Sequence, residues 1–332
     1  MERISIPDLA ERIPDNYSAY LFLEEMRWPE GPLCPHCGHV GANYIKPREG
    51  TARATRTGNP SQRRLWQCKK CRRQFSAMTG TIFHGSKVPL RTWLLVVFEM
   101  CASKNGMAAR EIQRKYAVAP KTAWFMAHRI REAMRTRAPG ALIGTIVADE
   151  TWIGGDPTNK HGGSAPARAR REGVQIKPGE MGTIKTEKTP VLSLIDAETG
   201  EVRSRVVANV IGPTLRKVIA EQVNMGRSVL WTDDAAAYGT IGREFLSHSS
   251  VNHLQGEYER DGITTNRAEG YFGQLKRSIN GTYHHVSEEH LPRYLAEFDF
   301  RYSTSDLSDT QRMARLMGQV EDRRISYKRL VW

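Results

Sequence analysis

Three acidic side chains and a lysine stand where they could act together on a phosphodiester. Asp149 follows the apolar run 146–148, Asp233 follows the run 229–232, and Glu269 lies seven residues before Lys276. Runs of this kind are typical of buried strands, and functional side chains converge at strand ends in α/β sheets. Carboxylates bind hard cations, and two such ions activate the attacking and leaving oxygens of a phosphodiester. The spacing therefore predicts a Mg²⁺ (or Mn²⁺) site formed by Asp149, Asp233 and Glu269.

Each of these assignments has an alternative in the sequence. Asn266 and Glu269 have the three-residue spacing of a capping box, in which the glutamate only satisfies a backbone N–H. Glu150 and Asp234 are adjacent rivals of the two aspartates. On a helix, Lys276 would share a face with Glu269, about two turns away, and could contact phosphate near the metal ions.

Four of the five cysteines form two close pairs, Cys34 with Cys37 and Cys68 with Cys71. Paired thiolates at this spacing offer four sulfurs to one tetrahedral Zn²⁺, so the pattern predicts a zinc ribbon. Disulfide or redox use is the alternative, which a reducing cytosol disfavours. Arg72 and Arg73 directly follow the second pair and are candidate DNA contacts.

The positive charge of the chain is concentrated at one end. The net charge is +13, and residues 1–140 contain 24 lysines and arginines against 11 acidic residues, while the remainder has 25 of each. This distribution is typical of a nucleic-acid-binding region joined to a near-neutral domain. A merely soluble basic surface is the alternative.

Residues 89–137 carry helical periodicity, which breaks at 118–120. A helix ending near Tyr116 and a second helix begun by Pro120 have helix-turn-helix spacing, although a plain helical hairpin is also compatible. We expect Trp124, Met126, Ile130 and Met134 to pack inward. The side chains expected to contact DNA are Lys121, His128, Arg129, Arg131 and Arg135.

Beyond a break at 138–140 the pattern changes to strands followed by alternating strand and helix, which indicates a mixed α/β domain. The predicted fold class is multidomain α+β. Its expected parts are a helical cap (1–30), the zinc ribbon (31–80), the helix-turn-helix-like region (85–138), the catalytic domain (141–303, with a basic insertion at 156–188) and a helical tail (304–332). No apolar run is long enough to span a membrane, so we expect a cytoplasmic protein.

Four segments resemble the ISXO-like group of bacterial insertion-sequence transposases: DETWIGG, WTDDAAAY, VNHLQGEY and TTNRAEGYFGQLKRSINGTYHHVSEEHLPRYLAEFDFRY. The resemblance extends over about residues 20–303 and is most specific in the last segment. It implies an RNase H-like domain of the DDE type, in which Asp149, Asp233 and Glu269 bind Mg²⁺ and Lys276 assists DNA contact. Some members of the group have an asparagine as third residue, and Asn266 lies one helical turn before Glu269.

The activity implied by the resemblance is DNA transposition. Water would cleave a phosphodiester at the element end, and the released 3′-hydroxyl would attack target DNA without a covalent enzyme intermediate. The implied partner is double-stranded DNA, both element ends and target, bound by a homo-oligomer through the ribbon and helices. The alternatives are a non-catalytic DNA-binding regulator and an RNase H-like nuclease without strand transfer.

Overall fold

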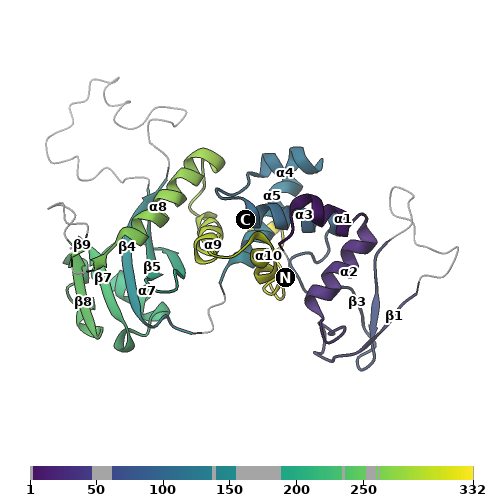
Figure 1. Cartoon of the computed structure of the whole chain (residues 1–332), viewed down its shortest axis with the longest axis horizontal. Coiled ribbons are helices and arrows are strands. Elements are labelled where there is room, and N and C mark those ends of the chain that lie inside the picture. Colours follow the sequence, from purple (N-terminus) through teal and green to yellow (C-terminus); the bar gives the residue numbers. More distant parts are fainter. Residues whose placement is uncertain are drawn as a thin grey trace, which may run out of the picture. The chain divides into compact units, whose positions relative to one another are not determined.

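The computed structural model describes residues 3–46, 62–136, 140–154, 188–233, 236–251, 259–260 and 262–331 (Figure 1). The chain forms two compact units, Met1–Thr136 with Thr304–Trp332, and Arg137–Ser303. Most of the expected basic insertion, Asp234 and most of the segment VNHLQGEY lie outside the described residues. Among the helices described, none has the length and apolar character to cross a membrane.

The first unit begins with two capped helices, α1 (Ile6–Arg12) and α2 (Asn16–Arg27). Ser5 and Asp8 form a reciprocal capping box at α1, and the Asp15 side chain accepts from the Ser18 N–H at α2. Leu9, Tyr20, Leu23 and Trp28 are buried, whereas Tyr17 and Leu21 are exposed.

The helical cap packs on a three-stranded antiparallel sheet, formed by β1 (Ala42–Tyr44), β2 (Trp66–Cys68) and β3 (Gln74–Phe75). Trp28, which follows α2, meets the rings of Trp66 and Phe75 edge-on, with centroids 6.3 and 5.6 Å apart. Buried Glu24 of α2 accepts from Arg64 Nε at 2.9 Å and from Trp66 Nε1 at 2.8 Å. Aromatic contacts and a satisfied buried ion pair thus join the cap to the sheet.

Three further helices follow, α3 (Leu90–Ala102), α4 (Ala109–Tyr116) and α5 (Pro120–Met134). The predicted helix end at Tyr116 and start at Pro120 are both confirmed, and Ala117, in the left-handed conformation, makes the turn between them. The end of the chain returns to this unit through α10 (Asp309–Met317) and α11 (Lys328–Val331). α10 contacts α2, α3 and α5, and its Thr310 Oγ1 accepts from the Ile4 N–H at 2.9 Å.

The polar face expected on α5 is largely absent. His128, Arg129 and Arg131 are 0%, 4% and 1% exposed, so the expectation that they form an exposed face of the helix is wrong. One cause is the C-terminal segment, because Tyr327 packs its ring against Trp124 and Phe125. Lys121 and Arg135, at the two ends of the helix, are exposed.

The second unit is built on a five-stranded mixed sheet in the order β6-β5-β4-β7-β8. Its strands are β4 (Thr145–Ile153), β5 (Thr189–Asp196), β6 (Val202–Val206), β7 (Val229–Asp233) and β8 (Ser247–Val251). The first three pair antiparallel, whereas β7 is parallel to both β4 and β8. A small ribbon of β9 (Glu259–Arg260) and β10 (Ile263–Thr264) lies outside this sheet.

The unit also contains the helices α7 (Gly212–Gln222), α8 (Asn266–Ser278) and α9 (Leu291–Ser303). Short 3₁₀ turns occur at Met225–Arg227, Ala236–Tyr238 and Ile241–Glu244, and a π-helical turn at Ile279–Tyr283 extends α8. Two hydrophobic clusters divide the faces of the sheet. Val147, Val191 and Ile195 pack with α8 and α9, whereas Ile146, Ala148 and Leu230 pack with α7.

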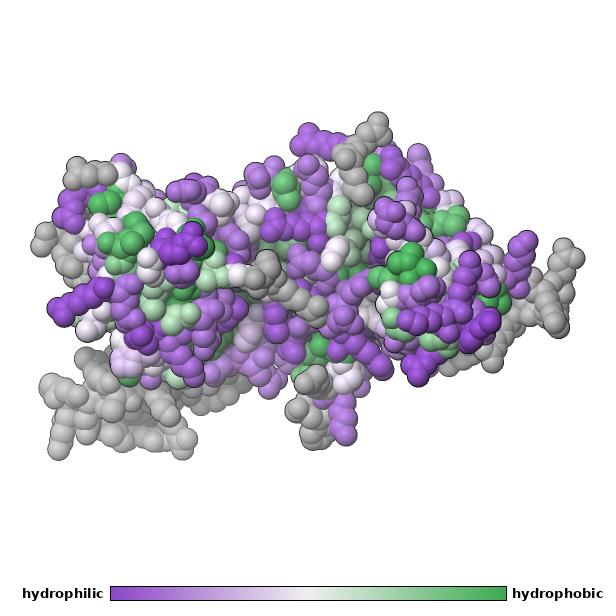
Figure 2. Space-filling model, turned by 90° about the horizontal axis from the view of Figure 1, so that it is seen from below, coloured by the Kyte–Doolittle hydropathy of each residue, from purple (hydrophilic) through white to green (hydrophobic). Residues whose placement is uncertain are grey.

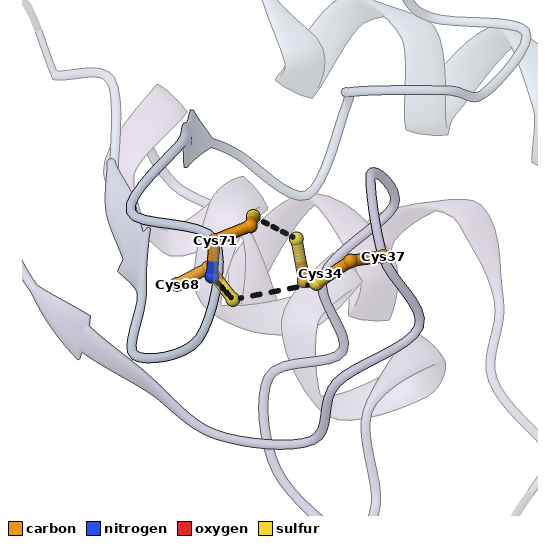
Figure 3. A group of neighbouring side chains, drawn as sticks. All are labelled: Cys34, Cys37, Cys68 and Cys71. Atoms are coloured by element: carbon orange, nitrogen blue, oxygen red, sulfur yellow. Dashed lines mark hydrogen bonds between the residues drawn. The ribbon is translucent and has the colours of Figure 1, made fainter.

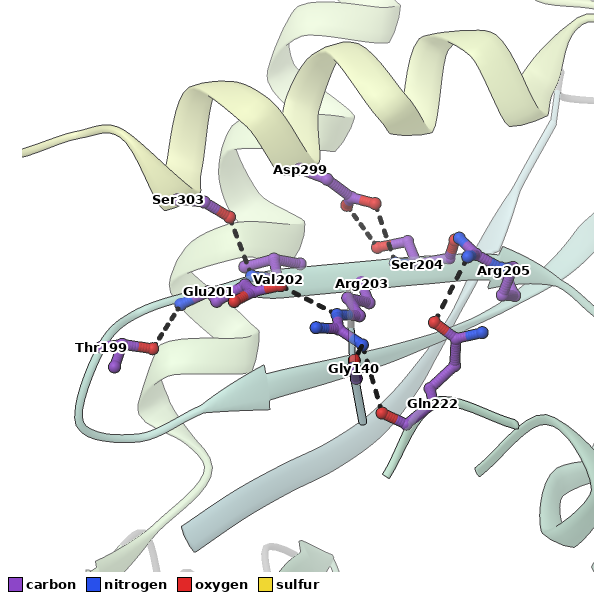
Figure 4. Close-up of polar contacts among 10 residues, drawn as sticks. All are labelled: Gly140, Thr199, Glu201, Val202, Arg203, Ser204, Arg205, Gln222, Asp299 and Ser303. Carbon is purple, nitrogen blue, oxygen red and sulfur yellow. Dashed lines mark hydrogen bonds and ion pairs between the residues drawn. The ribbon is translucent and has the colours of Figure 1, made fainter. Parts of the chain in front are cut away.

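Helix α9 protects the edge strand β6 (Figure 4). The outward N–H groups of Val202 and Ser204 donate to Ser303 Oγ at 2.9 Å and to Asp299 Oδ2 at 2.8 Å. Burial raises the pKa of Asp299 to about 6, against the lowering effect of hydrogen bonds from Tyr271 and Ser204. These bonds occupy an edge that could otherwise pair with another strand.

Large exposed hydrophobic side chains are few and dispersed in the described part of the chain, with Leu246 and Ile211 the most exposed. Figure 2 shows one face on which hydrophilic residues predominate and hydrophobic ones are scattered among them.

Candidate metal centre and acidic cluster

The two cysteine pairs lie on two turns with the same backbone pattern (Figure 3). In each, the N–H group four residues after the first cysteine donates to that cysteine's carbonyl: Gly38 to Cys34 at 2.9 Å and Arg72 to Cys68 at 3.1 Å. Both donors have positive φ angles, 68° and 60°. The turns direct the two thiols of each pair toward one point, and the Cys71 N–H reaches Cys68 Sγ at 3.4 Å.

The four sulfurs form a group with tetrahedral dimensions. Cys34 Sγ is 3.6 Å from Cys71 Sγ, Cys37 Sγ is 3.7 Å from Cys68 Sγ, and all four lie within 4.8 Å of one another. A regular tetrahedron with Zn–S bonds of 2.3 Å has S···S edges of about 3.8 Å. A disulfide requires about 2.0 Å, and all five cysteines are free. The donor set and its spacing fit Zn²⁺ and exclude the disulfide alternative.

Strand register brings the two aspartates of the second unit together. β4 and β7 pair in parallel as Thr145 with Val229 and Val147 with Trp231, and the same register continued along both strands puts Asp149 beside Asp233. Side chains alternate between the faces of a strand. Asp149 therefore shares the face of Val147, and Asp233 shares the face of Trp231, which packs in the same cluster. Both carboxylates project on the side of the sheet that α8 covers.

The alternation also separates Asp149 from its neighbour. Glu150 has the parity of Ile146 and Ala148, on the α7 side, and its carboxylate accepts a hydrogen bond from the buried Tyr238 hydroxyl. Burial, followed by the charge of Glu150, raises the pKa of Tyr238 well above its usual value. This pair was not predicted, although the alternating apolar residues of the strand contain the signal that places Glu150 on the opposite face.

Helix α8 carries Asn266, Glu269 and Lys276, all exposed. Its buried side is formed by Ala268, Tyr271, Phe272 and Leu275, which pack on the sheet. The N-cap is Thr265, no side-chain cap bond is present, and the Glu269 N–H donates to the Thr265 carbonyl at 3.2 Å. The capping-box alternative is therefore wrong, because Asn266 is the first residue inside the helix rather than its cap.

Asp149 of β4 is affected by the charges of carboxylates on β7 and α8. Burial, and then the charge of Asp233, raise the pKa of Asp149 to about 7, and the charges of Glu150 and Glu269 add to this effect. The opposing influence is a hydrogen bond from the Glu150 N–H to Asp149 Oδ1 at 2.7 Å. The pKa of Glu150 is also raised to about 7, first by burial and then by Asp233, against the hydrogen bond from Tyr238. Neighbouring carboxylates of this kind repel one another, so together they favour binding of a multivalent cation.

The acidic cluster is wider than the cysteine site. Within the described ranges, only the four cysteines bring three or more potential ligand atoms within 4.8 Å of one another. Oxygen donors of Asp149, Asp233 and Glu269 have the hard character that Mg²⁺ requires. The expected DNA contacts belong to the other unit, where Arg72, Arg73, Lys121 and Arg135 are exposed.

Comparison with known proteins gives matches over both regions. Residues 141–303 match the ISXO2-like transposase domain, and residues 14–74 match the transposase zinc-ribbon domain. An uncharacterized protein in transposable element ISH50 of Halobacterium salinarum is 25% identical over 280 residues, covering 84% of this chain and 88% of that protein.

A solved structure of the simian T-cell lymphotropic virus intasome, in complex with PP2A regulatory subunit B56 gamma, also matches. The identity is 11% and the TM-score 0.27, over 56% of this chain and 62% of that chain, which is too low to define a shared fold. The two matched domains and the transposable-element relative agree with the cysteine site and the mixed α/β unit. The chain belongs to the ISXO2-like transposases of insertion sequences, with an N-terminal zinc ribbon.

Proposed function

We propose that this transposase cleaves DNA and transfers the cut strand at the acidic cluster, with Asp149, Asp233 and Glu269 holding Mg²⁺ ions. The first unit would bind the element ends. We also propose an RNase H-like fold for the second unit, an assignment that the five-stranded mixed sheet covered by helices on both faces supports.

The convergence of the three carboxylates carries this proposal. The β4–β7 register, continued by two residues, puts Asp149 beside Asp233 on one face of the sheet, and the charges of Asp233 and Glu269 both act on Asp149. A buried carboxylate whose pKa is raised by neighbouring carboxylates, as that of Asp149 is, is costly in a fold unless a cation compensates it. A non-catalytic regulator would not need such a cluster, which favours the enzyme over the regulator.

The residues would divide the work according to their positions. The two aspartates project from the central strands β4 and β7 and would form the rigid side of the metal site. Glu269 would complete it from α8, and Lys276, seven residues later on the same helix, would contact a phosphate of the bound strand. When bound, Mg²⁺ would activate the attacking oxygen and stabilise the leaving oxygen.

Glu150 has a different role in this scheme. Its hydrogen bond with Tyr238 lies on the α7 side, so we assign Glu150 to packing on that side of the sheet rather than to metal binding.

The test compares neighbouring carboxylates in a strand-cleavage assay. The substrate would be the DNA that flanks the gene, where inverted repeats would mark the element ends. Asp149→Asn and Asp233→Asn are expected to lower cleavage in Mg²⁺ by at least 100-fold while DNA binding is retained, because a lost metal ligand removes transition-state stabilisation. Glu150→Gln serves as the matched control and should keep most of the activity. Full cleavage by Asp149→Asn would refute the catalytic assignment.

A further inference from the structure

A cavity of about 750 Å³ opens at the start of α5 in the first unit. It is bordered by the segment 85–89, by the turn between α4 and α5, and by Tyr327. Lys87, Lys121 and Arg129 contribute its charged lining, and none of the described residues that line it is acidic. The cavity is therefore electropositive by composition and lies apart in sequence from both sites described above.

Arg129 supplies a buried positive charge to this cavity. Its guanidinium lies between the rings of Trp93 and Phe125, 5.3 and 5.2 Å from the ring centroids, and its Nη2 donates to the His84 carbonyl at 2.7 Å. Its Nε is buried and finds no acceptor among the described residues. No carboxylate of the residues that the structure describes forms an ion pair with Arg129. Buried cations are normally paired with an anion, so this one favours an anionic ligand.

The neighbouring titratable groups indicate the same positive potential. Burial, with the nearby charge of Arg324, lowers the pKa of Arg129 to about 10. Burial and the charges of Arg324 and Arg129 also lower the pKa of His84. An anion bound here would relieve the repulsion between these cations.

The start of α5 adds two further attractions for an anion. Ala119 provides no side-chain cap, and the first N–H groups and the dipole of a 15-residue helix favour negative charge at its N-terminus. Lys121, in the first turn, holds its Nζ 4.9 Å from the centroid of the Tyr327 ring. Cation–π contacts thus orient both Lys121 and Arg129 at this cavity.

We propose that this cavity binds a backbone phosphate of a DNA strand, held by Lys121, Arg129 and the start of α5, with Lys87 at its border. The inference depends on the proposed function in taking DNA as the ligand of the first unit. A DNA strand suits the site better than free phosphate, because the cavity has the volume of a site for a much larger ligand and distributes three cations around its lining. Such a contact anchors DNA without reading its sequence.

The test measures binding of the full chain to a short random-sequence duplex over a range of salt concentrations. Lys121→Gln and Lys87→Gln should each weaken binding several-fold and reduce the slope of log K against log salt by about one, as expected for one lost phosphate contact. Lys217→Gln, which removes an equal charge from exposed α7 of the second unit, is the control and should change neither. Arg129→Lys keeps the charge but loses the planar group, and should weaken binding while the zinc content is unchanged.

Several outcomes would overturn the assignment. A Lys121→Gln variant with the same affinity and slope as Lys217→Gln would exclude a phosphate contact. If inorganic phosphate raised the Tm of the wild type but not of Lys121→Gln, and duplex binding were equal in both, the cavity would be a small-anion site instead.

The proposed catalytic function can fail separately. Asp149→Asn should keep the wild-type salt slope, so an unaffected cleavage rate in that variant would refute the acidic cluster without touching the phosphate cavity. A wild-type chain that does not bind duplex DNA at all would overturn both.

Discussion

Adjacent residues of one strand have different environments in this transposase. Asp149 and Glu150 both have pKa values raised to about 7, mainly by burial. The next largest influence on Glu150 is a hydrogen bond from Tyr238, whereas that on Asp149 is the charge of Asp233. A carboxylate surrounded by other carboxylates is suited to binding a cation, whereas one that accepts from a tyrosine is already satisfied. The alternation of strand side chains is the origin of this difference.

The third acidic position is decided by charge in our proposal. Glu269→Gln removes a negative charge near Asp149 and should lower Mg²⁺-dependent cleavage by at least 100-fold, with a higher Mg²⁺ concentration needed for half-maximal rate. Asn266→Ala removes a neutral side chain one turn earlier and should lower the cleavage rate by less than tenfold. Both residues are exposed, so neither change should affect folding. Cleavage rates measured across a Mg²⁺ titration would distinguish them, and the opposite order would assign the third position to Asn266.

The sequence identified the acidic positions better than the basic ones. Asp233 is the last residue of β7, as its apolar run predicts. The expectation that Asp149 also ends a strand is wrong, because β4 (Thr145–Ile153) continues beyond the apolar run. The burial of Arg129 and Arg131 is not local, because it depends on packing that the α5 sequence does not contain. Tyr327, about two hundred residues later, contacts Trp124 and Phe125 and covers part of the expected polar face.

At the level of elements, most helices and strands could be predicted. The helix begun by Pro120 is observed because helical periodicity and a proline at the first position give strong local signals. Strand β8, which spans Ser247–Val251, could not be predicted. Its polar sequence SHSSV lacks the apolar alternation that would mark a strand, and its pairing with β7 defines it instead.

The zinc ribbon contains little regular secondary structure. Its strands are two or three residues long, so metal binding should supply much of the local stability. We predict about one zinc ion per chain, lost in Cys68→Ser, together with lower duplex affinity. Metal analysis of the purified chain and binding assays would measure both. Cys101→Ser is the matched control, because Cys101 is buried in α3 and lies outside the four-sulfur group. The Cys101→Ser protein should keep its zinc. A Cys68→Ser variant with full zinc content would contradict the site.

At the level of the whole molecule, the positive charge is concentrated in one stretch of sequence, whereas the first unit is built from two separate stretches. The basic excess lies in residues 1–140, which contain the zinc ribbon, while the chain leaves this unit for the acidic cluster and then returns to it. The return was expected only as a helical tail. Its packing partners could not be predicted, because α10 meets α2 and α3 across almost the full length of the sequence. The second unit is thus inserted into the first.

This insertion predicts how a shortened chain would fail. A chain ending at residue 306 loses buried Met313, Leu316, Met317 and Val320 from the first unit, each contributing roughly 1.5–3 kcal/mol by burial. Hydrogen exchange followed by mass spectrometry should show faster exchange in α2 and α3 and unchanged protection in β4 and β5. A chain ending at residue 326, which keeps α10, is the control and should retain protection in α2 and α3. Equal exchange in both shortened chains would mean that α10 does not stabilise the first unit, whereas loss of protection in β4 and β5 would mean that the two units do not unfold separately.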